Sequence, residues 1–307
     1  MKRMLMLATC TVALAGCATV DTAPVARPAA VGDEQPAPDT MRWLYGSGEA
    51  AAASIQTWRQ IADYTIMVSR QRKMPHAVPM GLPEGKHGGV GAPSCMKADG
   101  TTKPFAAVFD VDETVLLNTG YEYWQALTGQ PFSADEWRQW ENNGAGIAQP
   151  VPGAVTGLRR LREAGITVVY NTNRDAGSVA GTIAAIEAAG IGPAVHGDTL
   201  FLRGDDEMGS RKDGRRAAIA EKYCVIAMGG DNLGDFADIL NADESAIAAR
   251  RTMVARGEYA QLWGNGWFLV PNPVYGAWQK GNLGEVFPPE AQWKPSPGDA
   301  PATMNRK

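Results

Sequence analysis

The chain has 307 residues, of which 45% are hydrophobic and 20% are charged, so it can bury the core of one large domain or of two small ones. Its formal net charge of −4 and its pI near 5.5 argue against a nucleic acid polymer as a partner, because binding a phosphate backbone requires a basic face. Any site for phosphate must therefore be local.

The first residues have the three parts of an export signal. Lys2 and Arg3 form a basic start, an apolar run covers residues 4–14, and small residues follow. The run is too short to cross a membrane as a helix. It ends in Leu-Ala-Gly-Cys at residues 14–17, which is similar to the bacterial lipobox that is cut before a cysteine. We therefore predict a signal peptide at residues 1–16.

Lipidation of Cys17 is the expected consequence, and it would anchor the protein to a membrane at its N-terminus. Ala18 follows instead of the aspartate that often retains such proteins at the inner membrane, which predicts an outer-membrane lipoprotein facing the periplasm or the cell surface. The alternative is an ordinary secretory signal with an incidental cysteine. Residues 17–42 have no apolar period and are predicted to form a flexible tether.

Two cysteines remain for pairing, because Cys10 leaves with the signal and Cys17 carries lipid. Cys95 and Cys224 can pair in an oxidising compartment. That pairing stays open, since Cys224 lies in an apolar run and is more often explained as a small buried hydrophobic residue. Three histidines and the absence of a Cys-x-x-Cys pair leave little support for a zinc site.

The folded domain is predicted to cover residues 43–290, followed by a Pro-rich tail at residues 291–307. The spacing of Trp58, Ile61 and Ile66 predicts one or two helices between residues 43 and 72. Residues 74–103 lose this period and are rich in Gly and Pro, which predicts a long loop.

After Pro104, short apolar runs alternate with helical patterns, which is typical of an α/β fold with a parallel sheet built from βαβ units. The predicted strands are residues 106–109, 166–170, 199–202 and 224–228. The predicted helices are residues 153–163, 178–189 and 213–222, with glycine C-caps at Gly165 and Gly190. The insert at about 118–152 is rich in aromatic residues and is predicted to form a small cap over the site.

Polar clusters follow the predicted core strands at residues 109–114, 170–174 and 229–235, and Lys212 stands at a helix start. Open parallel sheets bind ligands at the carboxyl ends of their strands, so we expect these clusters to converge. Asp110 and Asp112 are separated by one residue just after a strand and point the same way. Asp110 can therefore attack phosphorus as the nucleophile while Asp112 protonates the leaving oxygen.

Closely packed carboxylates require a cation, and oxygen ligands beside a phosphate favour Mg²⁺, with Asp231 as a further ligand. Thr172 offers a hydroxyl and a backbone N–H to the phosphate oxygens, and Lys212 neutralises charge on the phosphoryl group and the nucleophile. The spacing of Lys212 from Arg215 favours it over its basic neighbours. Asp235 can orient Lys212 or the waters of the metal. Each cluster alone is explained as a capping turn, but together they favour phosphoryl transfer.

These residues resemble the signature of the haloacid dehalogenase (HAD) phosphohydrolases. The matching positions are Asp110-x-Asp112-x-Thr114 for motif I, Thr172 for motif II, Lys212 for motif III and Asp231-x-x-x-Asp235 for motif IV. Segments at residues 110–118, 131–132, 151–155, 172–174, 230–233 and 271–276 are similar to the bacterial outer-membrane lipoprotein acid phosphatases of class C, a group that includes 5′-nucleotidases. The likeness runs from about Trp43 to Trp278.

The resemblance implies a Rossmann-like core with a small helical cap. It implies a Mg²⁺ ion held by Asp110, the backbone carbonyl of Asp112, and Asp231. It also implies that the protein acts on small-molecule phosphomonoesters, among them nucleoside 5′-monophosphates, through an aspartyl-phosphate intermediate.

Substrate binding is expected at Asn173, Trp137 and Tyr275, with the two aromatic rings on either side of the leaving group. For Trp137, packing in the core of the cap is an equal alternative. Two other functions stay open: a phosphotransferase that uses an alcohol as acceptor, and a non-catalytic binding lipoprotein on the same fold. Whether the chain forms a homo-oligomer is also left open.

Overall fold

The computed structural model describes residues 35–71, 75–84, 88–242 and 247–295. From Ala37 onward the described residues belong to one compact unit. The predicted signal peptide at residues 1–16, Cys17 and most of the tether therefore lie outside the described residues. Within the described part, no helix is both long enough and apolar enough to cross a membrane.

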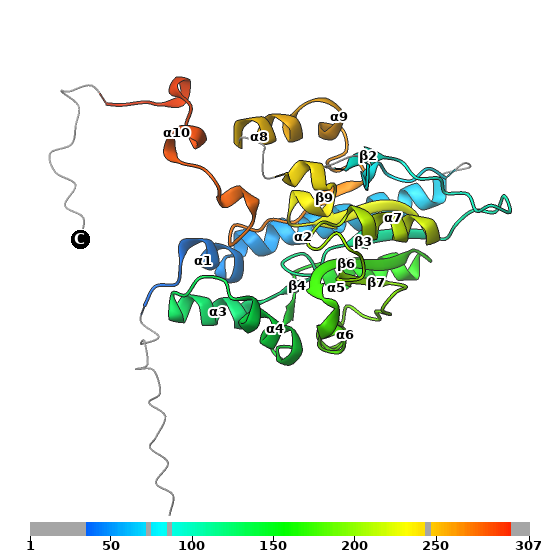
Figure 1. The fold of residues 1–307 in the computed structure, drawn as a ribbon, viewed down its shortest axis with the longest axis horizontal. Helices are drawn as coiled ribbons and strands as arrows, with labels where there is room; N and C mark the ends of the chain where they lie inside the picture. The colour runs from blue at the N-terminus through cyan, green and yellow to red at the C-terminus, as the bar shows by residue number, and fades with distance from the viewer. Residues whose placement is uncertain (1–34, 72–74, 85–87, 243–246, 296–307) are drawn as a thin grey trace, which may run out of the picture. The chain divides into compact units, whose positions relative to one another are not determined.

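A five-stranded parallel sheet forms the core of this unit (Figure 1). Its strands, in order across the sheet, are β7 (Leu200–Arg203), β6 (Thr167–Asp175), β3 (Phe105–Phe109), β8 (Cys224–Gly230) and β9 (Trp267–Leu269). All neighbouring strands are parallel. Their residues are largely apolar and buried, as expected for strands that are covered on both faces. The predicted α/β fold with a parallel sheet is confirmed.

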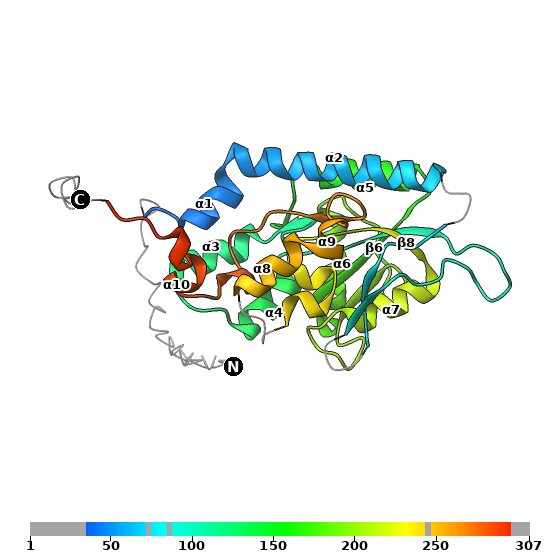
Figure 2. The ribbon, with the colours of Figure 1, turned by 90° about the horizontal axis from the view of Figure 1, so that it is seen from above.

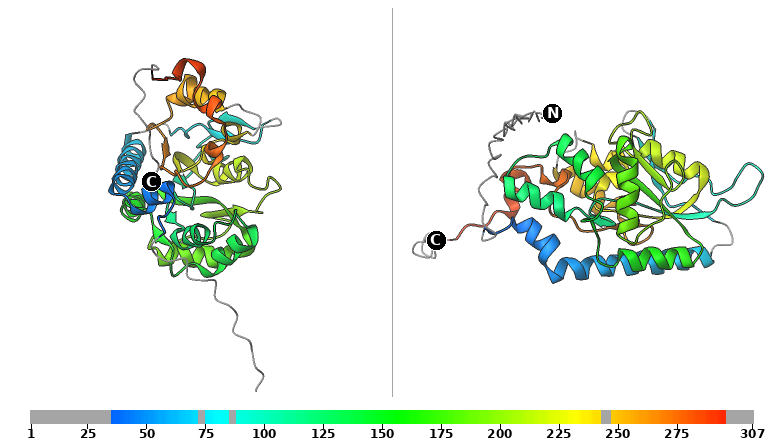
Figure 3. Two further views of the ribbon diagram at one scale, coloured as in Figure 1. Left: turned by 90° about the vertical axis from the view of Figure 1, so that its left-hand side faces the viewer. Right: turned by 90° about the horizontal axis from the view of Figure 1, so that it is seen from below.

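Helices cover both faces of the sheet. On one face α2 (Gly48–Gln71) and α5 (Ala154–Glu163) run side by side, as Figures 2 and 3 show. The ring of Trp58 from α2 packs against Phe109 of β3 with 5.1 Å between centroids. Residues of α6 (Val179–Ala188) join the same core, and α7 (Asp213–Lys222) packs on the opposite face.

The other helices are α1 (Asp39–Gly46), α3 (Thr119–Thr128), α4 (Ala134–Asn143), α8 (Ile247–Ala255), α9 (Gly257–Ala260) and α10 (Leu283–Val286). Helix α1 begins after Pro38, inside the range predicted as tether. Its first residue, Asp39, places a carboxylate at the positive end of the helix. The ordered unit thus starts slightly earlier than the apolar pattern indicates.

The cap insert contains two helices, α3 and α4, and a short antiparallel pair of strands lies at its ends. That pair, β4 (Leu116–Leu117) with β5 (Gln149–Pro150), joins the two ends of the insert. Local signals set the helix ends. Ser133 accepts a hydrogen bond from the backbone N–H of Glu136 at the start of α4, and Gly129 ends α3 in the left-handed conformation.

The prediction of a long loop at residues 74–103 is wrong in part. Two strands within it, β1 (Met80–Leu82) and β2 (Gly89–Gly91), pair antiparallel. They are too short and too rich in glycine to show a readable alternation. The same stretch carries Cys95, which forms a disulfide with Cys224 at the start of β8. The open question of cysteine pairing is thereby settled.

The path of the chain creates a crevice at one edge of the sheet. From the central strand β3 the chain moves outward to β6 and β7, and it then returns to β8 on the other side of β3. Loops leave such adjacent strands in opposite directions, which opens a binding site at their carboxyl ends. Asp110 directly follows β3 and Asp231 directly follows β8, so both acids lie at this switch point.

Candidate active site

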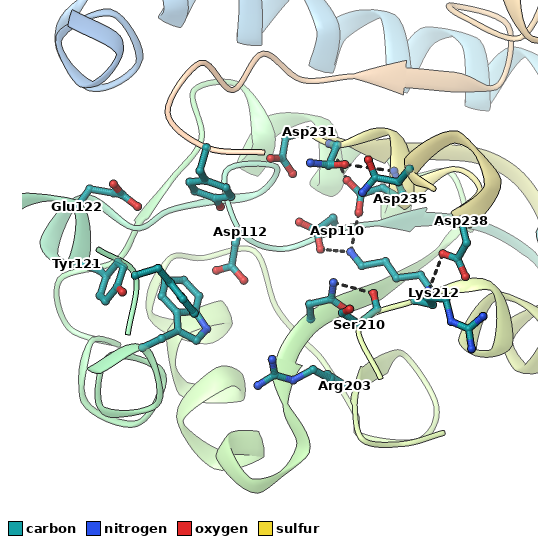
Figure 4. Close-up of a pocket in the computed structure, with 18 of the residues that line it drawn as sticks. Asp110, Asp112, Tyr121, Glu122, Arg203, Ser210, Lys212, Asp231, Asp235 and Asp238 are labelled. Carbon is teal, nitrogen blue, oxygen red and sulfur yellow. Dashed lines mark hydrogen bonds and ion pairs between the residues drawn. The ribbon is translucent and has the colours of Figure 1, made fainter. Parts of the chain in front are cut away.

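A cavity of about 810 Å³ lies over the carboxyl ends of the strands (Figure 4). Its lining includes eight of the predicted site residues, namely Asp110, Asp112, Trp137, Asn173, Lys212, Asp231, Asp235 and Tyr275. The size suits a nucleotide-sized ligand. The sheet edge and the cap therefore enclose one site.

Lys212 joins two of the acids. Its Nζ donates to Oδ1 of Asp110, and it also donates to Oδ1 of Asp235 at 2.7 Å (Figure 4). The three side chains are almost fully buried. Burial by itself lowers the pKa of Lys212, but attraction to Asp110 and Asp235 outweighs it, so the pKa is raised and the ammonium stays charged. A fixed positive charge is thus held beside Asp110.

Three acids form a compact cluster at the same place. Asp110, Asp231 and Asp235 each offer a carboxylate oxygen, and these oxygens lie within 4.8 Å of one another. Asp231 is held by two neutral donors, the hydroxyl of Thr114 at 3.1 Å and the amide of Asn272 at 2.8 Å. Oxygen donors at this spacing fit a hard divalent cation. The cluster includes the side chain of Asp235, for which the sequence predicts only an orienting role.

Local backbone chemistry positions Asp235. Its Oδ2 accepts from the backbone N–H of Asn232 at 2.8 Å, in a capping box at the short 3₁₀ turn Leu233–Asp235. A Cβ at Gly230 would collide with this carboxyl group. Glycine at the end of β8 therefore lets the side chain of Asp235 pack directly against the strand.

The electrostatics of the cluster favour a cation. Burial, then repulsion from Asp235 and Asp112, raises the pKa of Asp110 to about 7, although Lys212 opposes the shift. Burial and repulsion from Asp235 and Asp110 raise the pKa of Asp231 well above its usual range. One lysine does not offset this repulsion, so a further cation beside Asp110 and Asp231 would favour their ionised forms.

Asp112 lies outside this cluster and is held separately. Its Oδ1 accepts two hydrogen bonds from the guanidinium of Arg174, at 2.9 and 2.8 Å, and one from the amide of Asn118 at 2.9 Å. Arg174 is 1% exposed, and it also donates to the side-chain oxygen of Asn118. These contacts fix the orientation of Asp112 toward the cavity (Figure 4).

Thr172 and Asn173 are placed differently from one another. Asn173 lines the cavity, and its side chain is held by the backbone carbonyl of Ser210 and by Arg215. Thr172 is fully buried and is not among the lining residues; its hydroxyl accepts from the backbone N–H of Arg174 at 3.1 Å. The contact between Thr172 and phosphate stays a prediction.

The two aromatic residues predicted to bind substrate both line the cavity. Trp137 donates from Nε1 to Glu141 at 2.8 Å and packs edge-on against Tyr121, with 4.9 Å between ring centroids. Tyr275 donates its hydroxyl to Oε2 of Glu113. Trp137 thus belongs both to the packed interior of the cap and to the cavity wall.

Comparison with known proteins identifies the family. Residues 92–278 match the family described as HAD superfamily, subfamily IIIB (acid phosphatase). The chain belongs to this acid phosphatase family. Its members are phosphoric monoester hydrolases, so this acid phosphatase is an enzyme, and the alternative of a non-catalytic binding lipoprotein is excluded.

Solved structures support the fold. The crystal structure of the class C acid phosphatase from Bacillus anthracis with tungstate bound has a TM-score of 0.61 and 23% sequence identity, over 84% of this chain and 90% of that chain. A second structure of the Bacillus anthracis class C acid phosphatase has a TM-score of 0.60 and 23% identity, over 84% of this chain and 89% of that chain. The predicted resemblance to class C acid phosphatases is confirmed.

Several residues of the acid phosphatase site have no role assigned by the sequence. Arg174 lies in the segment at residues 172–174 that carries part of the family resemblance, but only the fold brings it to Asp112. Glu113 has a positive φ of 54° and is fully buried, and it accepts hydrogen bonds from Tyr45, Asn118 and Tyr275. Its place next to Asp112 in the polar cluster at residues 109–114 was a signal, but its two tyrosine partners lie far away in the chain.

Proposed function

We propose that this acid phosphatase uses Mg²⁺ and a phosphorylated Asp110 to hydrolyse phosphomonoesters, including nucleoside 5′-monophosphates. The observation that supports the proposal most directly is the meeting of Asp110, Lys212 and Asp231 at one edge of the cavity. A nucleophilic carboxylate, a fixed cation and a further metal ligand are the groups that phosphoryl transfer to an aspartate requires.

In the first step a carboxylate oxygen of Asp110 attacks phosphorus, and the bond from phosphorus to the leaving oxygen breaks. Asp112 gives that oxygen a proton. Arg174 and Asn118 both donate to Oδ1 of Asp112, which leaves Oδ2 to carry this proton. Lys212 offsets the negative charge that gathers around Asp110 and the phosphoryl oxygens.

In the second step water attacks the phosphorus of the phosphorylated Asp110. Asp112 takes a proton from the water, the bond between phosphorus and Asp110 breaks, and orthophosphate leaves. Both carboxyl groups return to their starting states. Replacing water with an alcohol gives phosphoryl transfer by the same chemistry, so product analysis with added alcohol separates the hydrolase from the phosphotransferase.

Asp110 and Asp231 would hold the ion, together with the backbone carbonyl of Asp112 that the family resemblance implies; Asp235 can add a further oxygen. When bound, Mg²⁺ supplies positive charge against the phosphate oxygens and lowers the repulsion among the carboxylates. HAD phosphatases use a divalent metal. The all-oxygen donor set supports Mg²⁺ as its identity.

Nucleoside 5′-monophosphates fit the aromatic half of the cavity. Trp137 and Tyr275 present rings there, and stacking on such rings accepts any base. The Bacillus anthracis relative binds tungstate, a tetrahedral oxyanion that resembles phosphate. Asn173 beside the phosphate end can donate or accept hydrogen bonds with the substrate.

The proposal is tested by activity against nucleotides, sugar phosphates and aryl phosphates, with Mg²⁺ and after chelation. Asp231→Asn is expected to weaken metal binding, so its activity should recover in part at high Mg²⁺, whereas Asp110→Asn should stay inactive at every concentration. Full activity after chelation would refute the metal requirement. If high Mg²⁺ restored activity equally in both variants, the separate roles of Asp110 as nucleophile and Asp231 as metal ligand would be refuted.

We also propose that the enzyme is an outer-membrane lipoprotein facing the periplasm or the cell surface. The support is the Leu-Ala-Gly-Cys sequence at residues 14–17 and the flanking composition. Cys17→Ser should release active enzyme from the membrane fraction and abolish labelling with a radioactive fatty acid, while Cys10→Ser should change neither. Unchanged labelling of Cys17→Ser would refute lipidation at this cysteine.

A further inference from the structure

Helix α3 of the cap buries an acid and exposes aromatic rings. Glu122 is 3% exposed, whereas its neighbours Tyr123 and Trp124 are 60% and 41% exposed. The hydrophobic effect alone favours the opposite arrangement, because a buried ring gains free energy and a buried carboxyl loses it. The position of Glu122 is therefore not explained by packing of the cap.

The carboxyl group of Glu122 also lacks a structural role. Its Oε2 is fully buried and has no hydrogen-bond partner among the described residues. Two other buried acids nearby do hold hydrogen bonds. Glu113 accepts from two tyrosines and Asn118, and Glu141 accepts from Trp137 through Oε1, although its Oε2 is also without a partner among the described residues. An unsatisfied buried acceptor costs about 1–3 kcal/mol, and a ligand that supplies the missing donor removes this cost. Burial and the nearby Glu113 raise the pKa of Glu122 to about 8.

Glu122 faces the part of the cavity that the leaving group occupies. The cavity wall there is made of Tyr121, Phe132, Trp137 and Tyr275, with Gln125 one turn further along α3. In Figure 4 Asp112 lies between the Asp110 and Lys212 end and the end formed by Tyr121 and Glu122. Because Asp112 is the proposed proton donor to the leaving oxygen, the leaving group extends from it toward Glu122.

A carboxyl group among aromatic rings is suited to a cation. An ammonium group forms a charge-assisted hydrogen bond with a carboxylate, and the ring faces attract the same charge. When an ammonium group binds at neutral pH, Glu122 releases its proton to the solvent, and the carboxylate and the ammonium form a charge pair. An anionic group at this end would instead meet an uncompensated acid.

We propose that Glu122 selects substrates by binding an ammonium group on the leaving group, so that phosphate esters of amino alcohols are preferred over matched neutral esters. This proposal rests on the function proposed above and names one substrate class within it. It assigns the specificity to a residue outside the reacting carboxylates.

The test compares ω-aminoalkyl phosphates of two to six carbons with n-alkyl phosphates of the same lengths, using the mature enzyme with Mg²⁺ near pH 7. At the best length, the ratio of kcat/KM for the amino ester to that for the neutral ester should be about tenfold or more, since a hydrogen bond to a charged group contributes about 1.5–3 kcal/mol. In Glu122→Gln the ratio should fall to about one. Glu163→Gln, an exposed acid on α5, should keep the wild-type ratio.

The outcomes separate the two proposals. Hydrolysis of the alkyl phosphates without any preference for an amine overturns the role of Glu122 and leaves the phosphatase function in place. A preference that Glu122→Gln retains also overturns it. If neither series is hydrolysed, the role of Glu122 is overturned, and activity against nucleotides and aryl phosphates then decides the phosphatase function separately. If Glu122→Gln does not fold, the wild-type ratio alone decides.

Discussion

Asp110 provides a test that joins stability to catalysis. Its pKa in the folded protein is raised from 3.8 to about 7, while in the unfolded chain it returns to its ordinary value. A group with a raised folded pKa contributes stability that is fully present below about pH 4 and is lost as the pH rises through about 7. The shift corresponds to about 4 kcal/mol, since one pKa unit is about 1.4 kcal/mol.

Asp110→Asn removes this ionisation and keeps the shape of the side chain. In the presence of a chelator at about pH 8, the variant should therefore be more stable than the wild type by up to about 4 kcal/mol, or roughly 10 °C in Tm. At about pH 4.5 the two proteins should unfold at similar temperatures. Mg²⁺ should raise the Tm of the wild type more than that of the variant, and more at pH 8 than at pH 4.5.

The assay is thermal unfolding followed by circular dichroism, beside phosphatase activity of the same samples. Asp63→Asn is the control, because Asp63 is exposed on α2 and its exchange should change Tm little. Asp110→Asn should be inactive with every substrate. A variant that is less stable than the wild type at pH 8 without metal would refute the electrostatic argument, and near-normal activity would refute Asp110 as the nucleophile.

Three further predictions follow from the site and the fold. Asp112→Asn should slow hydrolysis of alkyl and ribose 5′-phosphates far more than that of activated aryl phosphates, which leave with little protonation; equal slowing in a kcat comparison would contradict its role as acid. Tyr275→Ala should raise KM for a nucleoside monophosphate roughly tenfold more than for an alkyl phosphate, and equal KM changes on both substrates would refute stacking. Tyr275→Phe keeps the ring and should instead lose about 1 kcal/mol of stability, because the hydrogen bond from its hydroxyl to Glu113 is removed. Replacing both Cys95 and Cys224 with Ala should lower stability by about 5 kcal/mol, because the disulfide closes a separation of 129 residues and so restricts the unfolded chain. The kcat should not change, because the disulfide lies at the end of β8 opposite to the site. An unchanged Tm would contradict the expected loss of stability.

Local patterns in the sequence were sufficient for the core of the fold. Helix α7 occupies residues 213–222 as predicted, because its apolar spacing and its ends are local features. The strand β6 extends to Asp175 beyond the predicted residue 170, since its last residues are polar and pair with β7 only through the sheet. The strand β9 was not predicted, because its three residues form a strand by pairing with β8 and not by any period of their own.

The candidate site was predictable where chemistry depends on spacing along the chain. Asp110 and Asp112 are fixed by one strand end, and the convergence with Asp231 follows from parallel topology. The partners that orient these acids come from elsewhere in the chain. Arg174 reaches Asp112 from β6, and Asn272 reaches Asp231 from the segment after β9, and no pattern around either donor indicates its acceptor.

The types of hydrogen-bond donor around the acids explain how the site keeps a negative charge for a metal ion. Thr114 and Asn272 hold Asp231 with neutral groups, and Lys212 is the single cation that the described residues place on the cluster of Asp110, Asp231 and Asp235. A second basic side chain there would satisfy the carboxylates permanently and compete with a metal ion. Arginine is instead used at the side chain of Asp112, whose proposed task is proton transfer, while only the backbone carbonyl of Asp112 is proposed as a metal ligand. The two aspartates of one motif thus receive different partners, and this difference is the structural basis for assigning them different roles.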